Sequence, residues 1–510
     1  NVGEASIYRI NGPLDLTFLM KVNGLDGYDH LKYPKYEPQL SKDIHPDEDL
    51  FTQIRGKDIL LFHPFQSFDT VVDFVRQAAK DPDVLAIKQT LYRVSGNSPI
   101  IASLAEAAEN GKQVTVLVEL KARFDEENNI IWAKKLEKAG CHVIYGLVGL
   151  KTHSKITLVV RQEEDGIRRY VHLGTGNYND STAKMYTDMG LLTCAKPIGE
   201  DATAVFNMLS GYSEPLAWNK LSLAPLWLRD RFAELIHQEE INARDGRPAH
   251  IIAKMNSLCD RDIIVALYEA SRAGVRIELI VRGICCVRAE VPGKTENLHI
   301  RSLVGRYLEH GRIYSFYDGV TTRIYIASGD FLTRNTECRV EVGVRVEDPV
   351  LVRKLTDILQ LQLRDNVNAR EMRPDGSYQK VKPAEGEALV NGQMGMYELL
   401  KNDWTQPEPW KLSAAAQEKQ PEPSAEAEKP EPAKTEAAPA AKQAEASHPE
   451  SAAAPESGDR FDQLEQMVNH KKRTEPQPAP AAKPIKPVVV ETPAPRSRLK
   501  RILDFFRLRR

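Results

Sequence analysis

One stretch of the chain combines the residue types of phosphoryl transfer. Residues 150–179 read LKTHSKITLVVRQEEDGIRRYVHLGTGNYN, with His153 two positions before Lys155. On a strand such residues share a face, so the spacing pairs a nucleophilic imidazole with an ammonium group. His172 follows, ahead of Gly174-Thr175-Gly176-Asn177, where two glycines let backbone N–H groups converge on an anion. A lone strand histidine is most often structural, but this convergence favours phosphoryl chemistry.

The elements around this stretch are typical of an α/β sheet. Apolar runs at 156–160 and 170–173 surround the polar turn at 163–166, which predicts a hairpin. Strands are predicted at 58–64, 85–94, 114–120 and 142–147, and helices at 70–79, 100–111 and 130–139. This alternation predicts a mainly parallel sheet covered on both faces. Ligands of such sheets bind at strand carboxyl ends, where Arg93 and Arg123 lie.

The same elements recur later in the chain. Residues 100–118 (IIASLAEAAENGKQVTVLV) align without a gap on residues 263–281 (IIVALYEASRAGVRIELIV). In the second copy, His310-Gly311-Arg312 corresponds to His153-Ser154-Lys155. A helix, a strand and an H-x-[KR] motif in the same order indicate a duplicated domain. We expect the two copies to bring His153 and His310 into one cleft.

These motifs resemble a known family. The H-x-K motif with a glycine-rich strand end resembles the phospholipase D superfamily. The segments LYRVSGNSPI, LVELKARFDEENNI, KTHSKITLVVR, HLGTGNYN and STAKMYTD together resemble polyphosphate kinases of the long, phospholipase-D-like type, over about residues 1–404. The resemblance implies two duplicated phospholipase-D-like catalytic domains, each a mixed, mostly parallel sheet flanked by helices. It also implies reversible transfer of the ATP γ-phosphate to inorganic polyphosphate through a phosphohistidine.

The resemblance assigns roles to individual residues. His153 becomes the phosphohistidine, and His172 assists as an acid–base or positioning group. The expected ATP contacts are Tyr186, Arg282 and His310, and the expected phosphate contacts are Lys155, Arg93 and Arg123. Because arginine has no lone pair for a metal, we expect Mg²⁺ near Arg93 and Arg123 only through phosphate oxygens.

Some roles stay open at this level. His310 is either the general acid for ADP departure or a phosphate donor. Lys254 and Asn256, which falls opposite Arg93 in the repeat, are lesser candidates for the same cleft. His63, in LFHPF, is interpreted as structural.

Two other functions compete with this interpretation. A phospholipase-D-superfamily phosphodiesterase would have Asp five residues after the Lys, where this chain has Val160 and, in the second copy, Tyr317. A non-catalytic polyphosphate-binding scaffold would keep the arginines without needing His153. An acid-labile label from γ-labelled ATP separates the kinase from the scaffold.

Composition bounds the class of protein. The chain has 510 residues, and 69 Lys and Arg nearly balance 71 Asp and Glu, which argues against a general nucleic-acid binder. Its six cysteines show no CxxC spacing, which predicts reduced thiols in a cytoplasmic protein. No apolar run approaches the roughly 20 residues of a membrane span.

We divide the chain into five parts. These are the end of a truncated head domain with a linker (1–40), two catalytic domains (41–220 and 221–404), a disordered Ala/Pro/Glu/Lys-rich linker (405–495) and a basic amphipathic helix (496–510). The last part combines an apolar stripe with a cationic rim, so we predict peripheral docking at the inner face of a membrane or on a partner protein. The resemblance also implies a homo-oligomer that binds ATP, ADP and polyphosphate.

Overall fold

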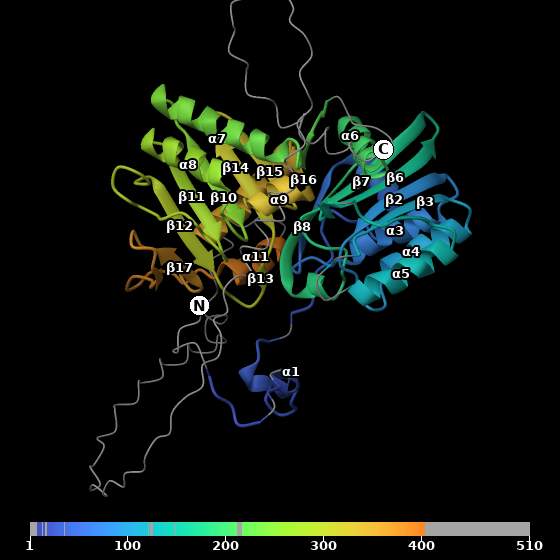
Figure 1. Cartoon of the computed structure of the whole chain (residues 1–510), viewed down its shortest axis with the longest axis horizontal. Helices are drawn as coiled ribbons and strands as arrows, with labels where there is room; N and C mark the ends of the chain where they lie inside the picture. The colour runs from blue at the N-terminus through green and yellow to red at the C-terminus, as the bar shows by residue number, and fades with distance from the viewer. Residues whose placement is uncertain are drawn as a thin grey trace, which may run out of the picture. The chain divides into compact units, whose positions relative to one another are not determined.

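The computed structural model describes residues 8–402, except residues 13, 16–17, 35, 121, 123–125, 148 and 212–216 (Figure 1). The predictions for Arg123, for the linker at 405–495 and for the helix at 496–510 therefore lie outside the described residues. The short elements that precede the first sheet are α1 (Phe18–Asn23), η2 (Asp29–Leu31) and α2 (Leu50–Gly56).

The first half of the chain forms most of an eight-stranded sheet in the order β1-β8-β7-β6-β2-β3-β4, with β13 paired to β8. The strands are β1 (Ile59–His63), β2 (Val84–Leu91), β3 (Gln113–Val118), β4 (His142–Ile144), β6 (Lys155–Glu163), β7 (Gly166–Gly174), β8 (Tyr186–Thr193) and β13 (Leu308–Glu309). The helices of this half are α3 (Asp69–Lys80), α4 (Pro99–Glu109), α5 (Glu126–Lys138), η3 (Thr182–Lys184) and α6 (Lys196–Leu209). As its sequence predicts, α4 begins with Pro99 after Ser98, whose hydroxyl accepts from the Ile101 N–H.

The second half forms most of a ten-stranded sheet in the order β18-β17-β12-β11-β10-β14-β15-β16-β5, with β9 paired to β16. Its strands are β5 (Lys151–Thr152), β9 (Leu221–Ala224), β10 (His250–Met255), β11 (Arg276–Val281), β12 (Leu298–Leu303), β14 (Arg312–Tyr317), β15 (Thr322–Ala327), β16 (Arg339–Val346), β17 (Ala369–Met372) and β18 (Tyr378–Lys380). The helices are α7 (Leu228–Arg244), α8 (Arg261–Arg272), α9 (Thr333–Cys338), α10 (Pro349–Leu363) and α11 (Gly392–Lys401). No helix in the described part of the chain is long and apolar enough to cross a membrane.

The α/β class with two duplicated, mixed sheets is confirmed, but less of each sheet is parallel than expected. Strands β2, β3 and β4 are parallel, as are their counterparts β10, β11 and β12. Strands β6, β7 and β8 are antiparallel, as are β14, β15 and β16. The difference arises because short turns, such as the one between β6 and β7, can join only antiparallel neighbours.

Each half sends a short strand into the sheet of the other half, directly before its H-x-[KR] motif. β5 precedes His153 and pairs with β16, whereas β13 precedes His310 and pairs with β8. One hydrophobic cluster also spans both halves and includes Leu158 of β6, Ile313 of β14 and Val342 of β16. The inner strands β8 and β16 of the two halves lie toward the middle of the molecule (Figure 1). The halves therefore share both strand pairing and a core.

This exchange predicts that neither half folds well without the other. Residues 41–211 and 217–402 expressed separately should aggregate or lack a cooperative unfolding transition, because each exposes half of a shared apolar core. Co-expressed, they should form a stable 1:1 complex, measured by size-exclusion chromatography with light scattering. Two separately expressed fragments that are each monomeric and unfold cooperatively would contradict the shared core.

Candidate active site

His153 lies where the chain crosses from one sheet to the other. The backbone N–H groups of His153 and Ser154 both donate to the carbonyl oxygen of Val340, at 2.9 and 2.8 Å, before β6 begins at Lys155. The Lys155 ammonium donates back to the His153 carbonyl oxygen. His153 and Lys155 are thus neighbours, but the expectation that they share one strand face is wrong. Pairing of β5 with the other half removes His153 from the hairpin and places it at the junction.

The imidazole of His153 is held by a carboxylate of the second half. Its Nδ1 lies 2.9 Å from Oε2 of Glu341 on β16, and the Ser328 hydroxyl donates to the same oxygen. Burial, and then the nearby Lys155 and Arg339, lower the pKa of His153 well below its usual value, so the ring is neutral near pH 7. The carboxylate favours a proton on Nδ1, which leaves the lone pair of Nε2 unprotonated.

Two further groups around His153 have shifted pKa values. Burial lowers the pKa of Lys155 to about 7, an effect that Glu341 opposes and Arg312 reinforces. Burial raises the pKa of Glu341 to about 7, against the influence of Lys155 and Ser328. Glu341 is therefore suited to hold or release a proton near neutral pH as the charge on His153 changes.

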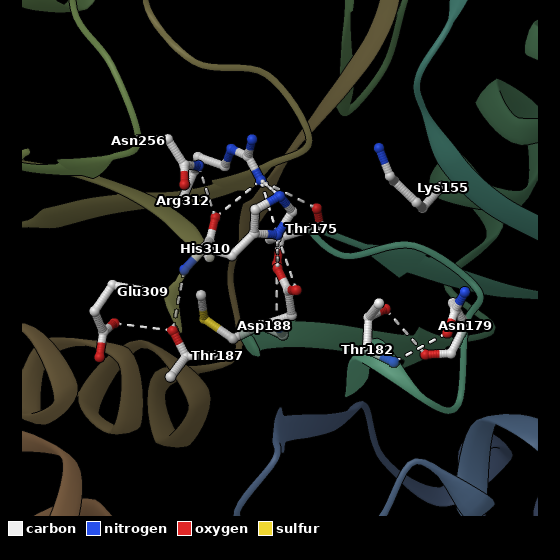
Figure 2. Close-up of polar contacts among 12 residues, drawn as sticks. Lys155, Thr175, Asn179, Thr182, Thr187, Asp188, Asn256, Glu309, His310 and Arg312 are labelled. Carbon is white, nitrogen blue, oxygen red and sulfur yellow. Dashed lines mark hydrogen bonds and ion pairs between the residues drawn. The ribbon is translucent and has the colours of Figure 1, made fainter. Parts of the chain in front are cut away.

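The second histidine repeats this arrangement with the roles of the halves exchanged. Nδ1 of His310 lies 2.8 Å from Asp188 Oδ1, and Asp188 belongs to β8 of the first half. Figure 2 shows the His310 ring between Asp188 and the guanidinium of Arg312. The ring of Tyr186 is also close, with its centre 5.6 Å from that of His310. Burial lowers the pKa of His310, while Asp188 opposes the shift.

Arg312 is the buried counterpart of Lys155. Its Nε and Nη2 donate to the two carboxylate oxygens of Asp330, at 3.1 and 3.2 Å, and its Nη1 donates to the carbonyl oxygens of Thr175 and His310, at 3.4 and 2.8 Å. Burial would raise the pKa of Asp330, but Arg312 lowers it to about 2. The bidentate pair fixes the guanidinium between the glycine-rich strand end of the first half and His310.

The structure shows contacts of two other predicted cations, Arg93 and Arg282. Arg93 follows the carboxyl end of β2, as expected, and its guanidinium carbon lies 5.8 Å from the ring centre of Tyr92. The Tyr92 ring in turn forms a T-shaped pair with the His153 ring, at 4.9 Å between ring centres. Nε of Arg282 donates to Asn256 Oδ1 at 2.6 Å, and Asn256 Nδ2 donates to the His310 carbonyl oxygen. Asn256, a lesser candidate from sequence, is therefore part of this site.

His172 occupies a different environment in the same hairpin. Its Nδ1 lies 2.8 Å from the hydroxyl of Tyr178, not against His153 or His310. Burial, and then His63, lower the pKa of His172 to about 3, so it is neutral. Together with His63, Asn177 and the glycines Gly174 and Gly176, it lines a small cavity. His63 is buried and its Nδ1 lies 2.9 Å from the Gln66 carbonyl oxygen, which accords with a structural residue.

The described residues offer cations and imidazoles, not a metal-binding cluster. Among them, no group of three or more His, Cys, Asp or Glu could hold a metal ion. The carboxylates of the site are already engaged: Glu341 with His153, Asp188 with His310, and Asp330 with Arg312. A metal ion bound directly by one of these carboxylates would have to displace a contact that the carboxylate already makes.

Comparisons with known proteins show the family of this chain. The family models "Polyphosphate kinase C-terminal domain 1" and "Polyphosphate kinase C-terminal domain 2" match residues 49–215 and 221–393. The chain belongs to the polyphosphate kinase family. It is 56% identical over 401 residues to a polyphosphate kinase of Halalkalibacterium halodurans, and 47% identical over 399 residues to one of Pseudomonas aeruginosa. These matches cover 78% of this chain and 57% and 58% of the two relatives.

A solved polyphosphate kinase has the same fold. The crystal structure of polyphosphate kinase from Porphyromonas gingivalis matches 73% of this chain and 57% of its own, with 37% sequence identity and a TM-score of 0.69. The chain thus spans about half the length of the polyphosphate kinases it matches.

Sequence reasoning missed the carboxylates of this candidate site. Asp188 and Glu341 occupy equivalent places in the two halves, in the motifs Asp188-Met189-Gly190 and Glu341-Val342-Gly343 on β8 and β16. The internal repeat, extended past the second strand of each hairpin, contains this D-x-G and E-x-G signal. Each carboxylate serves the histidine of the opposite half, which the one-dimensional pattern does not reveal.

The buried ammonium of Lys155 predicts a pH-dependent stability. The pKa of Lys155 is lower in the folded state than in the unfolded state. The folded state is therefore least stable below about pH 7, and its free energy of unfolding increases as the pH rises toward 10.5, because the unfolded state binds more protons in this range. Lys155→Met should therefore raise the Tm by about a few degrees at pH 7, and the gain should shrink by pH 10. Thermal unfolding followed by circular dichroism across this range measures it.

Lys254→Met is the matched control. Lys254 is as deeply buried, but its amino group lies 3.0 Å from the Glu309 carboxylate, so its loss leaves a buried charge unpaired and should lower the Tm. The prediction would be refuted by a Lys155→Met protein with a lower Tm than wild type at pH 7 and the same difference in Tm at pH 10. Such a result would show that the buried ammonium of Lys155 does not destabilise the folded state.

Proposed function

We propose that this chain carries the catalytic centre of a polyphosphate kinase, which transfers the γ-phosphate of ATP reversibly to inorganic polyphosphate through a phosphohistidine at His153. The observation that carries the proposal is the state of His153. It is neutral, its Nδ1 is tied to Glu341, and Lys155, Arg339 and Arg312 provide positive charge around it. A neutral imidazole surrounded by cations suits attack on a polyanion.

In the first half-reaction, the lone pair of His153 Nε2 attacks the γ-phosphorus. A P–N bond forms, the bond between this phosphorus and the β–γ bridging oxygen breaks, and ADP leaves with the electron pair of that bond. The ring becomes more acidic as it gains positive charge, and Glu341 stabilises it by accepting the hydrogen bond or the proton of Nδ1. Lys155 and Arg312 offset the charge on the equatorial oxygens.

In the second half-reaction, a terminal oxygen of polyphosphate attacks the phosphorus of the phosphohistidine. The P–N bond breaks, its electron pair returns to Nε2, and the chain is one phosphate longer. The energy of the P–N bond resembles that of an anhydride, so the same steps run in reverse with ADP as acceptor. His310, oriented by Asp188 and flanked by Tyr186, is placed to donate a hydrogen bond to a phosphate oxygen of the nucleotide.

The remaining ligands and partners are part of the same proposal. ATP and polyphosphate are the substrates, and Arg93 and Arg282 are assigned to phosphate. Mg²⁺ bound to the nucleotide phosphates would neutralise part of their charge. Self-association, and docking of residues 496–510 on an anionic membrane or a partner protein, remain proposals from the sequence.

The phosphohistidine is tested by labelling. In the complete protein, His153→Ala should abolish both polyphosphate synthesis and the label acquired from γ-³²P-ATP, because the only proposed nucleophile is gone. The wild-type label should be lost in acid and retained in base. As a control, His299→Ala, which changes a half-exposed histidine on β12, should label like wild type. Labelling of the His153→Ala protein would point to another nucleophile, with His172 the first to examine.

The role of Arg93 is tested by turnover. Arg93→Ala should lower kcat by about 10²–10³-fold, with a smaller change in the KM for ATP, because charge develops in the transition state. Arg93→Lys should recover part of the loss, since a point charge cannot reproduce the guanidinium fork. Steady-state kinetics measures both variants; wild-type kcat in Arg93→Ala would remove the residue from the site.

A further inference from the structure

A buried carboxylate lies directly before His310 and has no part in the chemistry described above. Glu309 is 4% exposed and forms, with Leu308, the short strand β13 that enters the sheet of the first half. Its carboxylate receives four contacts, from the Thr187 hydroxyl (2.9 Å), Gln362 Nε2 (3.1 Å), Gln393 Nε2 (2.7 Å) and Lys254 Nζ (3.0 Å). This level of bonding offsets the cost of burying a carboxylate so deeply.

The pairing of β13 with β8 links this carboxylate to His310. Glu309 lies beside Thr187 in the register, and the next residues are His310 and Asp188. Side chains alternate along paired strands, so one pair faces the site and the other faces away from it. Figure 2 shows this alternation: Asp188 reaches the His310 ring, whereas Thr187 and Glu309 meet each other on the other side of the backbone.

The backbone around His310 is anchored to the same network. Lys254, which contacts the Glu309 carboxylate, also donates to the Gly311 carbonyl oxygen at 3.0 Å, so it brackets His310 from both sides. The His310 N–H donates to the Thr187 hydroxyl at 3.2 Å, and Arg282 Nε donates to the Glu309 carbonyl oxygen at 2.5 Å. The position of the imidazole against Asp188 therefore depends on groups bonded to Glu309.

Two helices late in the described chain contribute to the network. Gln362 belongs to α10 and Gln393 to α11. Gln393 also bonds the backbone of Tyr307, accepting from its N–H at 2.9 Å and donating to its carbonyl oxygen at 2.8 Å. Hydrogen bonds from α11 thus hold the loop that leads into β13. Glu309 connects these helices to His310, the next residue of the chain.

We propose that Glu309 is a positioning residue for the phosphoryl-transfer reaction. Through Thr187, Lys254 and the two glutamines it fixes β13, and thereby sets the distance and angle of the His310 imidazole relative to Asp188 and the nucleotide. This inference rests on the proposed function. It assigns Glu309 no contact with substrate. Glu309 acts on the position of the His310 imidazole. Misplacement of a catalytic group by about 1 Å can lower the rate on the order of 10²-fold.

The test compares Glu309→Gln with Glu309→Asp in the complete protein. Glu309→Gln keeps the shape but removes the charge that Lys254 contacts, so kcat for polyphosphate synthesis should fall by about 10–100-fold while the KM for ATP changes by less than about 3-fold. Glu309→Asp, which keeps the charge, should recover part of the rate. The low-pH limb of kcat should shift in Glu309→Gln, because the coupling of His310 to Asp188 changes.

A second variant separates charge balance from positioning. Lys254→Met combined with Glu309→Gln removes both buried charges, and should restore much of the Tm lost in Glu309→Gln. Because the anchor of β13 is still missing, it should not restore kcat. Recovery of kcat together with Tm would show that Glu309 acts only through stability, and would overturn the proposal.

Glu239→Gln is the matched control. Glu239 is fully buried on α7 and pairs with Arg323 at 2.9 Å, with no contact to the site residues. Its substitution should lower the Tm with kcat unchanged. Wild-type kcat and an unshifted pH profile in Glu309→Gln would refute the inference. Absence of polyphosphate synthesis by the wild-type protein would instead refute the proposed function.

Discussion

The structure depends on two hydrogen bonds between a histidine of one half and a carboxylate of the other. His153 is oriented by Glu341, and His310 is oriented by Asp188. A buried imidazole that must stay neutral and present one nitrogen needs a fixed acceptor at the other nitrogen. Because each acceptor belongs to the opposite half, neither half contains a complete site. The exchanged strands β5 and β13 bring each histidine to its acceptor.

The site accumulates positive charge at a cost to stability. Lys155 and Arg312 are almost completely buried, and burial lowers the pKa of Lys155 to about 7. Isolated buried cations are unfavourable, so Asp330 pairs with Arg312, and Glu341 lies close enough to oppose the shift of Lys155. This arrangement suits a ligand that carries dense negative charge, since such a ligand would supply the missing counter-charge on binding. Stability given up in the free protein is typical of active sites.

The two halves are related by duplication but are not equivalent. Near His153 the cations are Lys155 and Arg339, and the carboxylate is glutamate. Near His310 the neighbours are Arg312 and Tyr186, and the carboxylate is aspartate. The pKa of Glu341 is raised to about 7, whereas His310 and Arg312 keep the pKa of Asp188 low despite its burial. One copy is therefore suited to exchange a proton during covalent chemistry, and the other to hold a fixed hydrogen-bond geometry.

The sequence by itself determined the duplicated α/β class, the hairpin of β6 and β7 and the capped helix α4, and it singled out His153, Lys155 and His310 as candidate site residues. These features follow from local periodicity and turn residues, which act over short separations along the chain, and from a repeat that a direct comparison of two segments reveals. Only the tertiary structure decided that His153 lies outside the hairpin strand, that Asp188 and Glu341 serve opposite halves, and that Glu309 anchors β13. The contacts of His153 with Glu341 and of His310 with Asp188 join residues more than one hundred positions apart, and those of the Glu309 carboxylate span 53 to 122 positions. Such pairs arise from strand exchange between sheets, which periodicity within a single strand cannot encode.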